Sequence, residues 1–100
     1  MRELIVGGQV LLVARVAGRY YAAQGRCPHM GGRLADGKLQ GQIVTCPLHG
    51  STFDVTTGAV VAWIVRLPGL VRSLAQVVKK PTNLATYPAK VEDEQVWVRL

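Results

Sequence analysis

The sequence predicts an all-β fold in a single domain that spans residues 1–100. The chain has 100 residues, of which 49% are hydrophobic, which is enough for one compact core and too little for two. Turn-forming pairs that contain glycine recur along the chain, from Gly7-Gly8 to Thr57-Gly58. They divide it into short segments, which is typical of a sheet protein with many short strands.

The strands are expected between these turns. The clearest pattern is a hairpin around Gly18, with strands over 10–16 and 19–23. The other short strands are expected over 42–45, 51–55, 59–62 and 95–100. In the last of these segments every second residue from Val96 is apolar, as a half-buried strand requires.

One segment has a helical rather than a β periodicity. Apolar residues recur at helical spacing from Leu70 to Val78, with polar residues on the opposite face, and Pro68 and Pro81 bracket the segment. We therefore expect one additional short amphipathic helix over about residues 69–80. Its role is open between covering a sheet edge and forming a docking or dimer contact, and the wide apolar stripe favours the first.

The charge pattern and the hydropathy argue against nucleic acid and membrane as partners. The net charge is +6, which favours acidic partner surfaces. Nucleic-acid binding is not expected, because the basic residues are scattered and Lys79-Lys80 is their only adjacent pair. The apolar runs fall well short of the roughly 20 residues that span a bilayer, and the first residues do not resemble a secretion signal. We expect a cytoplasmic protein with no membrane contact.

Two short motifs contain every cysteine and every histidine of the chain. They are Cys27-Pro28-His29 and Cys46-Pro47-Leu48-His49. The spacing differs from that of a zinc finger, which pairs two cysteines on one knuckle and two histidines on a helix. The mixed pairs suit two facing loops that each provide one thiolate and one imidazole to a metal centre. Structural zinc, and an arrangement that binds no metal, remain the alternatives at this point.

The residues around these motifs carry a family resemblance. The chain reads CPHMGG at 27–32 and CPLHGSTFD at 46–54, followed by a Thr-Gly pair at 57–58. This resembles the Rieske [2Fe–2S] domain signature, over about residues 10–62 and again over 87–100.

The resemblance implies a β-sandwich base that carries a small cluster-binding subdomain. It also implies one [2Fe–2S] cluster per chain, with Cys27 and Cys46 on the inner iron and His29 and His49 on the outer iron. Ser51 is expected to donate a hydrogen bond to a cluster sulfur. Two neutral imidazoles in place of two thiolates make the cluster less negative, so Rieske potentials lie at about −150 to +300 mV, against about −400 mV for plant-type clusters.

The loop sequences indicate a branch of the family. High-potential respiratory members have an additional cysteine in each loop, joined as a disulfide, and a tyrosine after the second loop. Those positions are Gly32, Leu48 and Phe53 here. The chain therefore resembles the ferredoxins and oxygenase components of ring-hydroxylating systems. Arg26 and Arg33 flank the first loop and are expected to add a positive field.

Other residues near the motifs are expected to be structural. Asp54 and Thr57 are interpreted as shaping the turn after the second loop. Trp63 and Trp97 are interpreted as core or edge packing. With every cysteine and histidine assigned to ligation, no catalytic residues are predicted.

We therefore expect a one-electron carrier that connects a flavin-dependent reductase to a terminal oxygenase. The alternative is a small subunit of a larger oxidoreductase, such as a nitrite-reductase-type complex. The sequence leaves the identity of donor and acceptor and the role of the 64–86 segment open. It also leaves the oligomeric state open, although a monomer is favoured.

Overall fold

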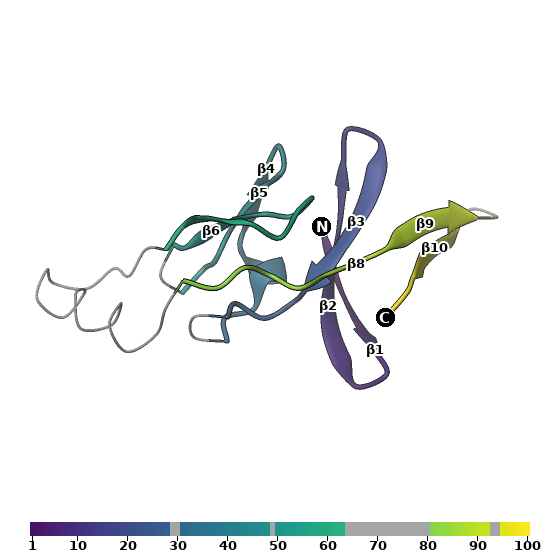
Figure 1. Ribbon diagram of the computed structural model, residues 1–100, viewed down its shortest axis with the longest axis horizontal. Coiled ribbons are helices and arrows are strands. Elements are labelled where there is room, and N and C mark those ends of the chain that lie inside the picture. The colour runs from purple at the N-terminus through teal and green to yellow at the C-terminus, as the bar shows by residue number, and fades with distance from the viewer. Residues whose placement is uncertain (29–30, 49, 64–80, 93–94) are drawn as a thin grey trace, which may run out of the picture.

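A computed structural model describes residues 1–28, 31–48, 50–63, 81–92 and 95–100, and in this part the chain forms antiparallel sheets with one short 3-10 helix (Figure 1). The all-β prediction is confirmed. The helix expected over 69–80 lies outside the described residues. Among the described residues, no helix is long and apolar enough to cross a membrane.

The first sheet forms the base of the molecule. Its strands, in spatial order, are β1 (Arg2–Val6), β2 (Gln9–Val16), β3 (Arg19–Gln24) and β8 (Thr86–Tyr87), and all neighbouring pairs are antiparallel. The expected hairpin around Gly18 is confirmed as β2 and β3. Ala17 and Gly18 both have positive φ, 51° and 81°, as a tight turn that matches the strand twist requires.

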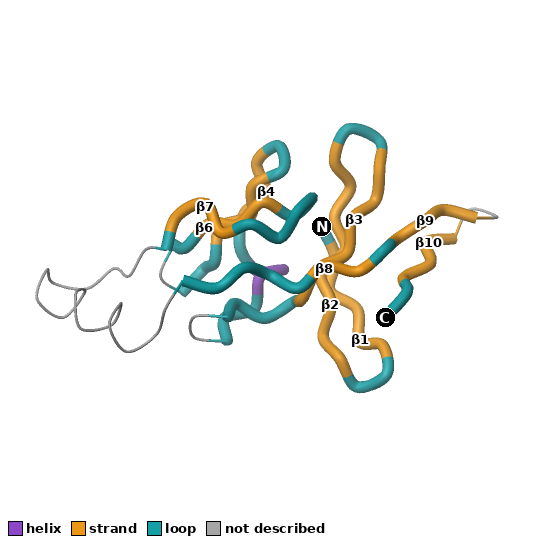
Figure 2. Tube along the Cα trace, viewed as in Figure 1, coloured by secondary structure: helices purple, strands orange, loops and turns teal. Residues whose placement is uncertain are grey.

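The second sheet is smaller and is formed by the central part of the chain. It contains, in spatial order, β4 (Lys38–Gln40), β5 (Ile43–Thr45), β6 (Thr52–Asp54) and β7 (Val60–Ala62), preceded by the 3-10 helix η1 (Leu34–Asp36). Two further strands, β9 (Ala89–Glu92) and β10 (Gln95–Val98), form a separate hairpin at the opposite end of the molecule (Figure 2).

The sequence located six strands directly, β2, β3, β5, β6, β7 and β10, although β10 ends at Val98 and not at residue 100. It did not locate β1 or β4. β4 contains a single apolar residue, Leu39, between two polar residues, so its sequence does not favour a strand, and β1 becomes evident only from its pairing with β2. The closing strands β8 and β9 were indicated by the family resemblance alone.

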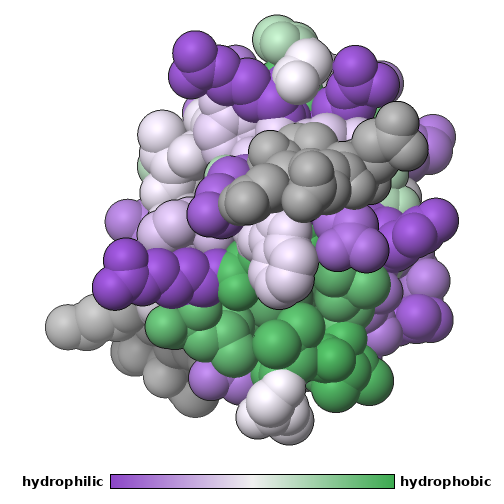
Figure 3. Space-filling view, turned by 90° about the vertical axis from the view of Figure 1, so that its right-hand side faces the viewer, coloured by the Kyte–Doolittle hydropathy of each residue, from purple (hydrophilic) through white to green (hydrophobic). Residues whose placement is uncertain are grey.

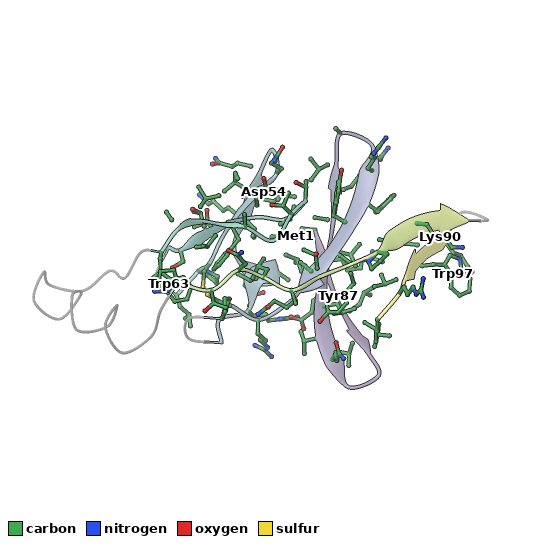
Figure 4. The ribbon with its side chains drawn as sticks, viewed as in Figure 1. Met1, Asp54, Trp63, Tyr87, Lys90 and Trp97 are labelled. Atoms are coloured by element: carbon green, nitrogen blue, oxygen red, sulfur yellow. The ribbon has the colours of Figure 1, made fainter. Side chains whose placement is uncertain are left out.

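The core lies where the two sheets meet. Eleven buried residues form one cluster: Leu12, Ala14, Ala23, Cys27, Leu34, Val44, Cys46, Phe53, Val55, Trp63 and Leu84. Phe53 is fully buried and meets Trp63 edge to face, with ring centroids 6.4 Å apart. Trp63 is thus a core residue, while Trp97 on β10 is exposed, and Figure 4 shows the two at opposite ends of the molecule.

The end that carries the β9–β10 hairpin has an apolar surface. Figure 3 looks onto this end and shows hydrophobic side chains gathered in its lower half. Large exposed apolar residues of β1 and of the C-terminal segment are Ile5, Trp97 and Leu100. The cysteines lie toward the other end: Cys27 lies between β3 and η1, and Cys46 lies between β5 and β6 of the second sheet.

Candidate metal centre

The two cysteine motifs occupy two loops beside the second sheet. The first loop, residues 27–32, connects β3 to η1, and the second loop, residues 46–51, connects β5 to β6. Cys46 directly follows β5, and Cys27 directly follows Arg26, which forms an isolated β-bridge with Arg33. This placement fixes their backbone positions.

The first loop is closed by its own backbone. The Cys27 N–H donates a hydrogen bond to the Gly32 carbonyl at 2.8 Å, and the Gly31 N–H donates to the Cys27 carbonyl at 2.8 Å. Gly31 has a φ of 73°, a conformation that costs about 1–2 kcal/mol for a residue with a side chain. Glycine at this position allows the loop to turn back on itself.

The second loop repeats the same hydrogen-bond pattern. The Cys46 N–H donates to the Ser51 carbonyl at 2.8 Å, and the Gly50 N–H donates to the Cys46 carbonyl at 3.0 Å. Gly50 also has a positive φ, 84°. The two loops therefore present their cysteines from equivalent positions of equivalent backbone turns.

The two loops touch at Gly32. A Cβ atom at this buried glycine would lie 2.8 Å from Cys46 Sγ and 3.1 Å from the Leu48 side chain. Real Cβ atoms essentially never approach so closely. The missing side chain lets the loops meet, and positions 32 and 48 lie side by side.

The structure brings both cysteines into the buried core. Cys27 is 3% exposed and Cys46 is 2% exposed, and Ser51, whose carbonyl accepts the hydrogen bond from the Cys46 N–H, is 1% exposed. His29 and His49 lie outside the described residues. Two soft thiol ligands in adjoining closed loops fit an iron–sulfur cluster, because thiolates are the ligands that such clusters prefer.

A hydrogen-bonded turn supports the second loop. The backbone N–H and the hydroxyl of Thr56 donate to Asp54 Oδ1 at 2.9 and 2.6 Å, and the Gln42 side-chain amide donates to Asp54 Oδ2 at 2.6 Å. The Thr57 hydroxyl accepts a hydrogen bond from the Ala59 N–H at 3.2 Å. The hydrogen bonds to Asp54 lower the pKa of its carboxyl, and the bond from the Thr56 hydroxyl has the largest effect. The interpretation of Asp54 and Thr57 as turn residues is confirmed.

Comparison with known proteins agrees with this geometry. The sequence model of the Rieske [2Fe–2S] domain matches residues 1–88. The chain belongs to the Rieske [2Fe–2S] domain family. A Rieske domain carries a [2Fe–2S] cluster.

The relatives of this Rieske domain include ferredoxin components of dioxygenase systems. The ferredoxin component of the naphthalene 1,2-dioxygenase system of Pseudomonas aeruginosa is 36% identical over 95 residues, which are 95% of this chain and 77% of the relative. The solved ferredoxin of carbazole 1,9a-dioxygenase from Nocardioides aromaticivorans IC177 has a TM-score of 0.75 and 26% identity, over 97% of this chain and 81% of that one. The chain is a Rieske-type ferredoxin.

A third comparison concerns a complex. The solved complex of reduced oxygenase and oxidized ferredoxin in carbazole 1,9a-dioxygenase contains a chain with a TM-score of 0.74 and 28% identity, matched over 98% of this chain and 86% of that one. Here too the likeness covers nearly the whole Rieske domain.

The sequence analysis did not predict the side-chain contacts that connect the first loop to other parts of the chain. The Gln24 side chain donates to the Arg26 carbonyl at 2.8 Å and accepts from the Ala85 N–H at 2.7 Å, so it joins the first loop to the segment before β8. Arg33 forms a salt bridge with Glu3 at 2.7 Å. Nothing in the local sequence indicates either contact, because the partners are distant along the chain.

Proposed function

We propose that this Rieske ferredoxin takes single electrons from a flavin-dependent reductase and delivers them to a terminal oxygenase. The observation that carries the proposal is the pair of matched cysteine loops, in a chain similar to dioxygenase ferredoxins over most of its length. One cluster per chain, held by Cys27, Cys46, His29 and His49, supplies one-electron reduction and oxidation at that end of the molecule.

The chain's own residues prepare this site. Burial of Cys27 and Cys46 keeps water from the sulfur atoms, and the closed backbone of each loop fixes where the thiolates lie. Ser51 is buried beside them, where its hydroxyl can donate a hydrogen bond to the bound group and raise its potential. These residues bind and tune the cluster and perform no acid–base step.

The partners are proposed from the relatives and from charge. In the carbazole system a related ferredoxin forms a complex with its oxygenase. The net charge of +6 favours acidic partner surfaces, which would speed the encounter at low salt. Leu48 is 52% exposed next to the loops, where an apolar side chain can pack against a partner. A monomeric carrier fits this role.

Transfer from the reduced protein to an oxygenase tests the proposal. The purified protein should be red-brown, with about two irons and two sulfides per chain. After reduction and removal of the reductant, it should be reoxidised by the oxygenase of a naphthalene-type dioxygenase system in stopped-flow absorbance measurements. Cys46→Ser, assembled under the same conditions, is the matched control without a complete ligand set.

Two results would contradict the proposal. A colourless protein with one zinc per chain would exclude the cluster. A cluster protein that reduces no oxygenase, but copurifies with a large oxidoreductase, would favour the role of a subunit.

A further inference from the structure

Glu3 occupies an unusual position for a carboxylate. It lies on β1 directly opposite Leu12 of β2, which in turn lies opposite Ala23 of β3. Residues that face each other across antiparallel strands project from the same side of a sheet. Leu12 and Ala23 belong to the buried core cluster. Glu3 therefore points to the core side of the base sheet, and its side chain is only 13% exposed.

The partner of Glu3 is the residue that follows the first cysteine loop. Arg33 Nε donates to Glu3 Oε2 at 2.7 Å, and Arg33 Nη1 lies 3.5 Å from Asp36 Oδ1. The backbone of Arg33 also forms a β-bridge with Arg26, the residue that precedes Cys27. The salt bridge therefore holds the first loop at its base, where Arg26 and Arg33, the residues on either side of the loop, pair with each other.

Arg33 is also close to the second loop. Its neighbour Gly32 is the residue whose Cβ position would lie 2.8 Å from Cys46 Sγ. The backbone of Arg33 directly follows this contact. A positive charge near the site favours the addition of an electron, and a negative charge opposes it. The salt bridge between Arg33 and Glu3 therefore affects both the position of the first loop and the electrostatic potential at the cysteines.

We propose that Glu3 is a positioning residue of the cluster site, which ties the first loop to the N-terminal strand and balances the charge of Arg33. The proposal rests on the ligand set proposed above and goes beyond it, since Glu3 is no ligand and lies 30 positions from Arg33. Glu3 acts on the site through Arg33.

Asp36 cannot replace Glu3 in this role. Its side chain is 58% exposed, its contact with Arg33 is longer, and it lies only three residues away on the same turn. Such an exposed ion pair contributes little and is screened by salt. It also connects Arg33 to nothing beyond the loop. Asp36→Asn therefore makes the same change in net charge as Glu3→Gln without releasing the loop from β1, and it is the matched control.

The charge balance predicts shifts of opposite sign in the two single variants. In Glu3→Gln the Arg33 charge loses its close partner, and the reduction potential should rise. In Arg33→Gln the Glu3 carboxylate loses its close partner, and the potential should fall. In the double variant the two losses compensate, and the potential should return close to the wild-type value. A residue that only stabilised the fold would not produce this pattern.

The experiment uses the full chain with its cluster assembled. Protein-film voltammetry gives the potentials, and loss of the visible absorbance in the presence of an iron chelator gives the rate of cluster release. We expect release about two- to fivefold faster in Glu3→Gln, as for a salt bridge of modest strength, and nearly unchanged in Asp36→Asn. Neither measurement requires a redox partner.

Equal behaviour of Glu3→Gln and Asp36→Asn in both measurements would overturn the proposal. Shifts of the same sign in Glu3→Gln and Arg33→Gln would do so too. A wild-type chain that assembles no cluster would instead refute the proposed function. The two failures are therefore distinguishable.

Discussion

Single residues at the site differ in how far the sequence reveals their role. The mixed cysteine–histidine motifs led to the prediction of two facing loops, and the structure brings Cys27 and Cys46 together in two adjoining closed loops. Their burial was not predicted. The positive field expected from Arg33 stays a prediction. The structure adds that Glu3 pairs with the Arg33 side chain. That pairing depends on the register of β1 against β2, which no local pattern encodes.

At the residue scale, replacing a ligand and replacing its neighbour should have separable effects. We expect His49→Ala to abolish the visible spectrum of the cluster, because an imidazole ligand is lost. Ser51→Ala should assemble the cluster but lower its potential, since it removes only a hydrogen-bond donor. Absorbance and voltammetry on the two variants provide the measurement. An unchanged spectrum in His49→Ala would show that the ligand assignment is wrong.

At the scale of elements, short strands and turns explain both the success and the gaps of the sequence prediction. The β2–β3 hairpin is long enough to show its turn and its alternation, and it was predicted nearly to its ends. β4 has three residues and pairs with β5. Its existence depends on a partner rather than on its own pattern. The turn between β6 and β7 shows how such short strands are held.

The glycine in this turn should be harder to replace than one in an open turn. Gly58 and Gly41 both have positive φ, 82° and 60°. A Cβ at Gly58 would run into the Leu84 carbonyl, whereas Gly41 has nothing within 4 Å. Both alanine variants carry the same backbone strain, so Gly58→Ala should be less stable than Gly41→Ala by about 1–3 kcal/mol, the usual range for overpacking. Urea unfolding of the cluster-containing variants measures the difference, and equal losses would contradict it.

The carboxylate in the same turn should give an acid-dependent contribution to stability. The pKa of Asp54 is lowered in the folded chain, mainly by the Thr56 hydroxyl. A carboxyl of this kind stabilises the fold above its unfolded pKa of about 3.9, and the contribution is lost as the pH falls through the lower folded value. Asp54→Asn should therefore melt below wild type at neutral pH.

The comparison across pH isolates the Asp54 carboxylate from other titrating groups. Wild type and Asp54→Asn have the same cluster ligands. The acid sensitivity of the cluster therefore cancels in the difference between their thermal midpoints. We expect this difference to shrink as the pH is lowered from about 6 to about 3.5. A difference that stays constant over this range would mean that hydrogen-bond geometry, rather than charge, accounts for the effect.

At the scale of the whole molecule, the two sheets and the β9–β10 hairpin are arranged along one direction, with the cysteine loops beside the second sheet and the hairpin at the far end (Figure 1). The sequence predicted the all-β class from its turns, and the division into a base and a cluster-binding part came from the family resemblance. The order of the sheets could not be read from local periodicity, because it depends on contacts between distant segments.

This one-sided arrangement has a consequence for the carrier proposed above. With the cluster held at the cysteine loops, donor and acceptor would use the same end of the molecule in turn, because the hairpin lies at the far end. A carrier of this kind would not bind both partners at the same time. It has to release one before it meets the other, and excess reductase should trap it. At a fixed concentration of oxygenase, turnover should pass through a maximum as reductase is added, and steady-state assays can measure this. A rate that rises to a plateau and stays there would mean that both partners bind at once.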